Sequence, residues 1–301
     1  MESKGKKLAE LLAAPEILIC PGIFDGYSAR MAAKYGYQSA VVSGAGVSEA
    51  HLGWADKGVM GYRENVEVCR VLASLSDDLL LQADADTGYG NAVNVHFTVR
   101  GFEDAGVAAV MIEDQVWPKR CGHLAGKSVI PADEMVDKVK SAVDARRDPD
   151  FIIKARTDAA GPLGINAAID RLNVYAEAGA ELLFADALLS EEDIANVAAN
   201  VPKPLAVNMG LGLLTRGTTP LIHPNRLQEM GVAMISYPRL MSTGAVRGMA
   251  NAMDALGDMI TSGEVVERPD LLMPFKDHNE LVGIGFLDAL EDRFAADKAD
   301  G

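Results

Sequence analysis

Short apolar runs recur along the chain, and each is followed by a polar turn and then by a segment with helical spacing. Runs this uniformly apolar are typical of parallel strands that are covered on both faces. In the intervening segments, apolar residues recur every three or four positions, as on one face of an amphipathic helix. The pattern predicts eight strands, at residues 17–21, 39–43, 79–84, 108–114, 151–158, 181–186, 204–209 and 232–238.

Eight strand-then-helix units in one chain predict a (β/α)8 barrel of the α/β class. The alternative is an open doubly wound sheet, which normally has fewer strands and a glycine-rich phosphate-binding turn. The one candidate for such a turn, SGAGVSE at residues 43–49, does not have the GxGxxG spacing. We therefore expect the closed barrel.

Composition and charge narrow the class of partner. The chain has 301 residues, 49% of them hydrophobic, with 28 basic and 43 acidic side chains and a net charge of −15. A field of this sign repels phosphate backbones and anionic lipids, which argues against nucleic-acid and membrane partners. A small acidic substrate would need a metal ion or a few cationic groups to reverse the local field.

The cysteines and the amino-terminal segment indicate a cytoplasmic protein. Three cysteines without a CxxC pair do not form a disulfide framework. The sequence starts with a charged, helix-prone segment that does not resemble a signal peptide, and no apolar stretch reaches the roughly 18 residues of a membrane span. Cys20 lies in an apolar run and Cys69 in a helical segment, so both are expected in the core.

In such barrels the chemistry lies where the strands end. Four of the eight predicted strands end in carboxylates, and we expect one shared mouth to hold them all. The residues concerned are Asp84, Asp86, Glu113, Asp114, Asp158 and Asp186.

Asp84, Asp86 and Glu113 have the character of a site for a hard cation. Residues i and i+2 of a strand share a face, so Asp84 and Asp86 can converge, and Glu113 follows the next strand. Mg²⁺ prefers few carboxylates and several waters, and Mn²⁺ is the alternative cation. The simpler interpretation is a capped turn with surface carboxylates.

The segment KRCGH, residues 119–123, lies in a long loop between residues 115 and 130. Cationic neighbours lower the pKa of a thiol, which would make Cys121 a usable proton donor or nucleophile. A loop of this length at a barrel mouth is also a natural lid. The alternative is a solvated basic loop with an incidental cysteine.

Further groups at the strand ends suit an anion. Arg156 ends an apolar strand, where a buried cation needs either a substrate carboxylate or a carboxylate of the mouth as its partner. Residues 43–45 (Ser-Gly-Ala) offer a hydroxyl and backbone N–H groups, although an ordinary turn explains them equally well. Asn208 could donate to the same ligand.

Three motifs occur in one order along the chain: DADTGYGN (84–91), IEDQVWPKRCGHLAGK (112–127) and IKARTDA (153–159). Together they resemble the isocitrate lyase/phosphoenolpyruvate mutase superfamily. KRCGH after EDQ is specific, and it resembles the carbon–carbon lyases of that superfamily, which act on substrates such as 2-methylisocitrate and 2,3-dimethylmalate.

The resemblance implies a role for each residue of the mouth. Asp84 would hold Mg²⁺ directly, whereas Asp56, Asp86 and Glu113 would act largely through metal-bound water. Cys121 would be the general acid on a closing loop. Arg156 and His123 would take part in catalysis and bind the substrate's carboxylates. The other substrate-binding positions would be Ser43, Gly44, Ala45, Gly122, Asp186 and Asn208.

The resemblance also implies an assembly and a reaction. Residues 1–264 would form the barrel, and residues 265–301 would be a helical segment exchanged between the subunits of a homotetramer. The reaction would be Mg²⁺-dependent cleavage of the C2–C3 bond of a branched 2-hydroxydicarboxylate into a 2-oxo acid, such as pyruvate, and a carboxylate. Tyr89 and a metal-bound water are the candidate bases. The alternatives are an oxaloacetate hydrolase, a phosphonopyruvate-type mutase and a catalytically silent binding barrel.

Three positions depart from the superfamily's pattern. Asp186 stands where a longer Glu is usual, a Glu expected soon after Asn208 is missing, and Trp54 and Ala55 precede Asp56. These positions surround the variable half of the substrate. They predict a larger or more apolar substituent on C3.

Overall fold

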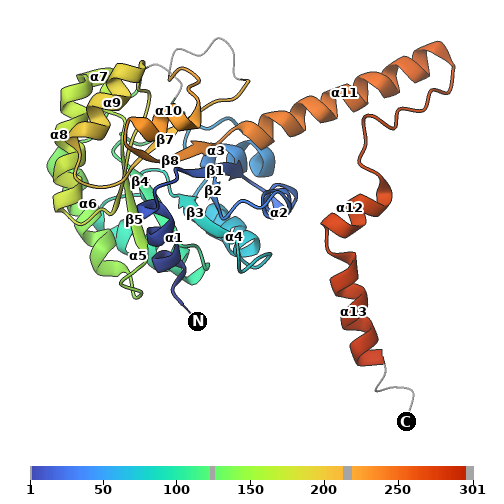
Figure 1. Cartoon of the computed structure of the whole chain (residues 1–301), viewed down its shortest axis with the longest axis horizontal. Coiled ribbons are helices and arrows are strands. Elements are labelled where there is room, and N and C mark those ends of the chain that lie inside the picture. Colours follow the sequence, from blue (N-terminus) through green and yellow to red (C-terminus); the bar gives the residue numbers. More distant parts are fainter. Residues whose placement is uncertain (1, 123–125, 213–218, 296–301) are drawn as a thin grey trace. The chain divides into compact units, whose positions relative to one another are not determined.

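The computed structural model describes residues 2–122, 126–212 and 219–295. Its parallel strands close into a barrel in which each strand pairs with the next and the last pairs with the first (Figure 1). The (β/α)8 barrel is therefore confirmed, and the strands lie where the apolar runs predict them. They are β1 (Leu18–Ile23), β2 (Ser39–Val42), β3 (Leu80–Asp84), β4 (Ala109–Glu113), β5 (Ile152–Thr157), β6 (Leu182–Ala185), β7 (Leu205–Asn208) and β8 (Val232–Tyr237).

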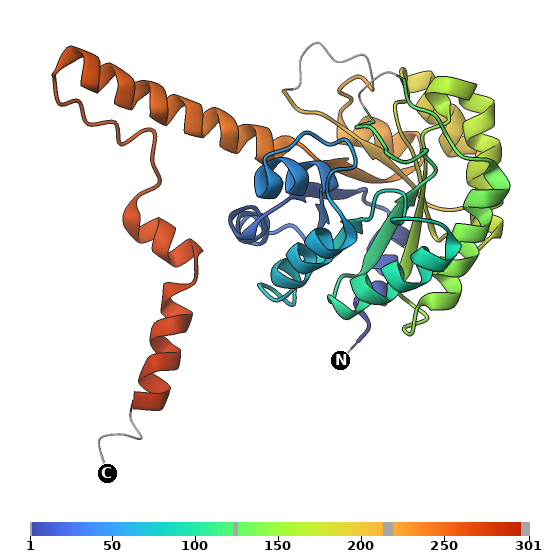
Figure 2. The ribbon, with the colours of Figure 1, turned by 180° about the vertical axis from the view of Figure 1, so that it is seen from behind.

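Helices surround the strands, as the two opposite views in Figures 1 and 2 show. The apolar faces of the longer helices between residues 26 and 200 pack on the outer faces of the strands, which explains the apolar spacing of three and four. The helices are α1 (Lys4–Ala13), α2 (Gly26–Lys34), α3 (Gly44–Val47), the π-helix η1 (Ser48–Leu52), α4 (Tyr62–Ala73), α5 (Ala92–Asp104), α6 (Ala132–Ala145), α7 (Ala160–Leu163), α8 (Ile165–Glu177), α9 (Glu191–Asn200), α10 (Pro224–Glu229), α11 (Leu240–Ser262), α12 (Phe275–Leu281) and α13 (Ile284–Ala295).

The barrel interior is a packed core that α1 closes at the amino ends of the strands. Leu8 and Leu12 of α1 are buried in the same cluster as the inward-facing Leu80, Ile152 and Leu182. Burying a leucine contributes about 2 kcal/mol. With this end closed, the carboxyl ends of the strands are the open face of the barrel.

The two cysteines expected in the core lie there. Cys20 of β1 and Cys69 of α4 are both fully buried, and burial raises the pKa of the Cys20 thiol to about 12. A neutral, buried thiol behaves as a small apolar group. The only half-exposed cysteine of the described chain is Cys121.

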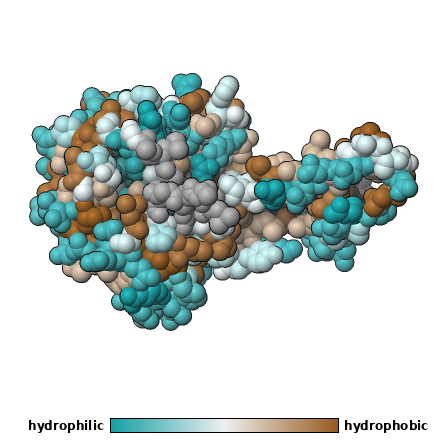
Figure 3. Space-filling model, turned by 90° about the horizontal axis from the view of Figure 1, so that it is seen from above, coloured by the Kyte–Doolittle hydropathy of each residue, from teal (hydrophilic) through white to brown (hydrophobic). Residues whose placement is uncertain are grey.

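The chain divides into two compact units, residues 1–242 and 243–301, so α11 begins in the first and continues through the second. The division lies before the expected boundary at residue 264, and the exchange of the terminal segment between subunits stays a prediction. Large apolar side chains are exposed throughout the second unit, where Figure 3 shows apolar surface. None of the helices among the described residues is long and apolar enough to span a membrane.

Candidate active site

A pocket opens at the carboxyl ends of the strands and is lined by residues of every strand from β2 to β8. Most of the expected site residues line it. These are Ser43, Ala45, Asp56, Asp84, Cys121, Gly122, Arg156, Asp186 and Asn208. Asp86 and Glu113 lie next to the pocket lining: Asp86 forms an ion pair with Lys119, and Glu113 forms one with Arg156. His123 lies outside the described residues.

Asp84 and Asp86 converge, but not by strand alternation. β3 ends at Asp84, and Asp86 has a left-handed backbone (φ 49°), so the shared strand face was the wrong reason. The Asp86 N–H instead donates to Asp84 Oδ1 at 3.3 Å. A Cβ on Gly44 would lie 3.0 Å from Asp84 Oδ2 and 3.5 Å from Asp86 Oδ1. Both carboxylates therefore reach one point, next to a residue that has no side chain.

Lys119 is the cation that forms ion pairs with the carboxylates on this side of the pocket. Its buried ammonium forms ion pairs with Asp56 and, at 2.7 Å, with Asp86 Oδ1. Burial raises the pKa of Asp86 to about 7; Lys119 opposes the rise, and Asp84 and Asp56 add to it. One lysine thus does not compensate three neighbouring carboxylates.

Glu113 connects the two sides of the pocket. It pairs in register with Arg156 across β4 and β5, and its Oε2 lies 3.1 Å from Arg156 Nε. Its other oxygen, Oε1, is buried and has no hydrogen-bond partner among the described residues. Burial raises the pKa of Glu113 well above its usual value. A buried, unpaired carboxylate oxygen indicates a missing donor, such as a water molecule held by a cation.

The residues present fit a metal ion with few direct protein ligands. The described chain contains no group of three or more His, Cys, Asp or Glu side chains already arranged around one point as metal ligands. The acidic donors that do converge are the carboxylates of Asp84 and Asp86. A hard cation that keeps several waters, as Mg²⁺ does, suits this set.

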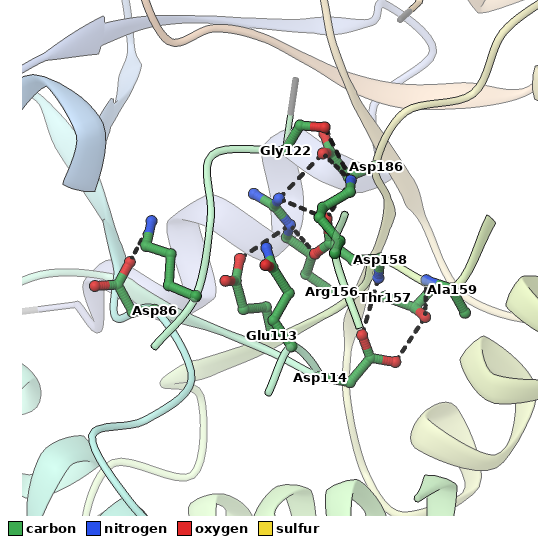
Figure 4. A network of polar contacts seen from close by, with 12 residues as sticks. Asp86, Glu113, Asp114, Gly122, Arg156, Thr157, Asp158, Ala159 and Asp186 are labelled. Carbon is green, nitrogen blue, oxygen red and sulfur yellow. Dashed lines mark hydrogen bonds and ion pairs between the residues drawn. The ribbon is translucent and has the colours of Figure 1, made fainter. Parts of the chain in front are cut away.

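On the other side of the pocket, cations and carboxylates balance (Figure 4). Arg156 Nε lies 2.8 Å from Asp158 Oδ2, and its Nη2 lies 3.1 Å from Asp186 Oδ2. Lys127 approaches the same two carboxylates, at 2.7 and 3.3 Å. Burial alone would raise the pKa of Asp158, but Arg156 and Lys127 hold it well below its usual value. Arg156 thus has carboxylate partners within the mouth, and its contact with a substrate stays a prediction.

Asp114 does not belong to the mouth, contrary to expectation. Its side chain accepts a hydrogen bond from Thr157 at 2.7 Å (Figure 4). It also accepts hydrogen bonds from Arg171 and Tyr175, at 3.0 and 2.8 Å. Arg171 and Tyr175 belong to α8, outside the barrel. Neighbouring residues at a strand end point to opposite sides, so the doubled carboxylate of this strand divides between the mouth and the helix layer.

The described parts of the loop, residues 115–122 and 126–130, are bridged to each other, and Lys119, Cys121 and Gly122 line the pocket. Gln115 and Val129 form an antiparallel bridge, and the Cys121 N–H donates to the Asp56 carbonyl at 3.2 Å. A Cβ on Gly122 would lie only 1.7 Å from Asp186 Oδ2. Close approach therefore requires glycine at position 122, beside Asp186 (Figure 4).

Cys121 lines the pocket and meets a cation that the sequence reasoning did not single out. The Arg239 guanidinium donates to Cys121 Sγ at 3.6 Å and binds Glu49 at 2.8 Å. Arg239 follows directly after the predicted end of the last strand, and this position could have identified it as a residue of the mouth.

Two expected polar groups interact with protein atoms in the pocket. Ser43 Oγ accepts the Gly46 N–H and caps α3, as an ordinary turn would. Asn208 Nδ2 points to Asp186 Oδ1 at 3.5 Å, and Asn208 Oδ1 accepts from Ser236. Their contacts with a ligand stay predictions.

Tyr89 lies away from the pocket. Its hydroxyl accepts a hydrogen bond from Asn65 Nδ2 at 2.8 Å, and it lines separate surface pockets beside α5. Burial raises the pKa of Tyr89 well above its usual value, so its hydroxyl stays protonated. The geometry does not favour Tyr89 as the base.

Comparison with known proteins identifies the family. The family model for phosphoenolpyruvate phosphomutase matches residues 8–256. A 2,3-dimethylmalate lyase from Eubacterium barkeri is 36% identical over 289 residues, 96% of this chain and 97% of that protein. The chain belongs to the phosphoenolpyruvate mutase/isocitrate lyase superfamily. Its relatives make it an enzyme of this superfamily and support a carbon–carbon lyase as its class.

Solved structures agree with this placement. An oxaloacetate acetylhydrolase bound to the inhibitor 3,3-difluorooxalacetate superposes with a TM-score of 0.88 at 33% identity, over 98% of this chain and 97% of that chain. A phosphonopyruvate hydrolase in complex with oxalate and Mg²⁺ gives a TM-score of 0.84 at 25% identity, over 98% and 100% of the two chains. One superfamily fold therefore accommodates several reactions.

Proposed function

We propose that the protein cleaves the C2–C3 bond of a branched 2-hydroxydicarboxylate, 2,3-dimethylmalate or an acid similar to 2-methylisocitrate, in a reaction that depends on a divalent metal. The products are a 2-oxo acid, such as pyruvate, and a carboxylate. The observation that carries the proposal is the position of Cys121. Its loop lies on the pocket through the contact of Gly122 with Asp186, and the thiol lines the same space as Asp84 and Arg156.

The metal would be Mg²⁺, held by Asp84 and surrounded by Asp56, Asp86 and Glu113. When bound, it would polarise the 2-hydroxyl of the substrate and favour the 2-oxo product. The excess of carboxylate around Lys119 and the unpaired Oε1 of Glu113 support this assignment. A 2-oxo acid and its carboxylates carry oxygen atoms that complete such a coordination shell.

Side chains of the protein would bind the negatively charged substrate and supply the proton that one product needs. Arg156 would bind a substrate carboxylate, and Cys121 would donate a proton to the carbon that leaves. Arg239, next to Cys121 Sγ, would offset the charge that remains on the sulfur. Residues 115–130 would close over the substrate and exclude bulk water.

We also propose that residues 265–301 are exchanged between subunits of a cytoplasmic homotetramer. The exposed apolar side chains of the second unit, Phe275 and Phe286 among them, support a partner surface for this segment. Light scattering at several protein concentrations tests the assembly. A monomer at all concentrations would contradict it.

The first experiment measures release of 2-oxo acid from 2,3-dimethylmalate, 2-methylisocitrate, citramalate, isocitrate and oxaloacetate, with Mg²⁺ or with EDTA. We expect turnover of a branched malate that EDTA abolishes. The solved oxaloacetate acetylhydrolase gives the second candidate, an oxaloacetate hydrolase. Oxalate and acetate as the products from oxaloacetate would favour that candidate over the lyase.

Replacement of Cys121 tests the proton donor. Loss of a general acid costs about 10²- to 10⁴-fold in rate, so Cys121→Ser is expected to lose this much kcat while it still folds and binds Mg²⁺. Cys69→Ser is the matched control, because Cys69 is a thiol of α4 outside the pocket lining. Unchanged turnover in Cys121→Ser would remove the thiol from the mechanism.

A further inference from the structure

The floor of the pocket contains a lysine that the proposed mechanism does not use. Lys154 lies on β5, two residues before Arg156, so both side chains point into the barrel. The Lys154 side chain lines the pocket although it is only 2% exposed. Its ammonium lies 5.1 Å from the centre of the Phe184 ring. In the sequence, Lys154 is recognisable as a charged residue within the apolar run FIIKAR.

Lys154 differs from the other described cations of the pocket lining. Lys119 has Asp86 at 2.7 Å, Arg156 has Asp158 at 2.8 Å, and Arg239 has Glu49 at 2.8 Å, whereas Lys154 forms no ion pair with a described carboxylate. A buried ammonium without an anionic partner is costly. The contact with the Phe184 ring offsets only part of that cost.

The groups beside Lys154 do not supply the missing negative charge. Two acidic groups act on the charge of Lys154, Asp84 and Cys20. Asp84 forms no ion pair with Lys154 and is assigned to the metal in the proposed function, and burial raises the pKa of the Cys20 thiol to about 12, so the thiol stays neutral. Gln82 Nε2 donates to Ser39 Oγ at 3.0 Å, and Gln82 Oε1 is buried without a partner in the described structure. Burial lowers the pKa of Lys154 to about 8, so the ammonium is still mostly charged at neutral pH.

We propose that Lys154 binds a third acidic group of the substrate at the pocket floor, so that the preferred substrate is a 2-hydroxytricarboxylate. This inference rests on the proposed function, in which Arg156 binds one substrate carboxylate; the superfamily resemblance implies that the loop binds a second. The third carboxylate would be carried on the C3 substituent, because the metal, Arg156 and the loop are assigned to the 2-hydroxyl and to the two other carboxylates. The expected larger substituent is thus acidic at its end, rather than apolar throughout.

Binding of an unreactive tricarboxylate tests the site without turnover. Tricarballylate has three carboxylates but lacks the 2-hydroxyl, and succinate is the matching dicarboxylate. Isothermal titration calorimetry in Mg²⁺ compares wild type, Lys154→Met and Lys154→Arg. Lys4→Met is the matched control: it removes the same charge from a lysine at the amino end of the barrel, where it donates to the Gly106 carbonyl.

We expect wild type and Lys4→Met to bind tricarballylate at least about tenfold more tightly than succinate. Lys154→Met should lose this preference through weaker tricarballylate binding alone, and Lys154→Arg should retain most of it. Equal affinities of wild type and Lys154→Met for tricarballylate would overturn the inference. That result would leave Lys154 a structural residue, with its ammonium satisfied by water or by an adventitious ion only.

The activity panel separates failure of the inference from failure of the proposed function. In an active enzyme, Lys154→Met should lower kcat/KM for 2-methylisocitrate and isocitrate by at least about tenfold more than for 2,3-dimethylmalate. An active enzyme without this difference overturns the role of Lys154 alone. Inactivity of wild type on the whole panel, together with loss of tricarballylate binding in Lys154→Met, overturns the proposed lyase alone and supports the anion site.

Discussion

The two halves of the pocket mouth both consist mainly of buried residues, but they differ in charge. The acidic half consists of Asp56, Asp84, Asp86 and Lys119. The balanced half consists of Lys127, Arg156, Asp158 and Asp186. When all groups are ionised, the first has two negative charges in excess, and the second has none.

The pKa of an aspartate is therefore shifted in opposite directions in the two halves. Asp86 and Asp158 are both buried, yet the pKa of Asp86 rises to about 7 and that of Asp158 falls well below its usual value. Burial raises the pKa of both carboxyls, and the number of nearby cations decides the outcome. In the balanced half, the positive charges equal the negative charges. The acidic half lacks positive charge, which a divalent cation would supply.

Removing one carboxylate from each half is the strongest test of this difference. Asp158→Asn leaves two buried cations short of a partner, and we expect it to lower the free energy of unfolding by about 3 to 5 kcal/mol. Asp86→Asn keeps the shape and relieves repulsion, so its cost in metal-free protein should stay below about 1 kcal/mol. Urea unfolding in EDTA measures both. Equal losses in the two variants would show that the halves do not differ.

Magnesium should stabilise the acidic half specifically. At about 100 times its dissociation constant, a ligand of the folded state adds about 2.7 kcal/mol to the free energy of unfolding. We expect this gain in wild type and in Asp158→Asn, but not in Asp84→Asn. Thermal unfolding in MgCl₂, compared with NaCl of equal ionic strength, measures it. The same gain in Asp84→Asn would place the cation elsewhere.

The barrel and most of its mouth were predictable because both follow from local patterns. Apolar runs specify the strands, and the fold itself brings their carboxyl ends together. Asp84, Asp186 and Arg156 could therefore be assigned to one pocket from their positions alone. The side to which Asp114 points was not predictable from a doubled carboxylate, because it depends on where β4 ends.

The pairing of charges could not be predicted from strand ends. Lys127 reaches the mouth from a loop and Arg239 from the turn between β8 and α11, and spacing along the chain does not specify such contacts. The left-handed turn that brings Asp86 to Asp84 also depends on tertiary context. Lys154 was visible as a charge within an apolar strand, but only the structure shows that it is buried without a carboxylate partner.

Acid should weaken the balanced half first. The pKa of Asp158 in the folded protein lies below its usual value of 3.8, so the folded state binds fewer protons than the unfolded state. The contribution of Asp158 is therefore fully present above this value and is lost as the pH falls below it, by at most about 1.4 kcal/mol per pH unit. Urea unfolding from about pH 6 to about pH 3 should show a shallower decline in Asp158→Asn than in wild type. Identical declines would contradict the ion-pair assignment; Asp77→Asn, which removes an exposed carboxyl, is the control.

The smallest expected effect concerns the link between the loop and the balanced half. Lys127 Nζ donates to the Gly122 carbonyl at 2.9 Å and contacts Asp158 and Asp186, so it holds the loop against the pocket. Lys127→Met should favour the open loop and lower kcat/KM by about tenfold, or about 1.4 kcal/mol. The exposed Lys203 gives the control variant, Lys203→Met, which should keep full activity. Because Lys127 does not touch the acidic half, stabilisation by Mg²⁺ should be unchanged in Lys127→Met. Loss of that stabilisation would mean that the two halves are coupled through the loop and cannot be treated as separate units.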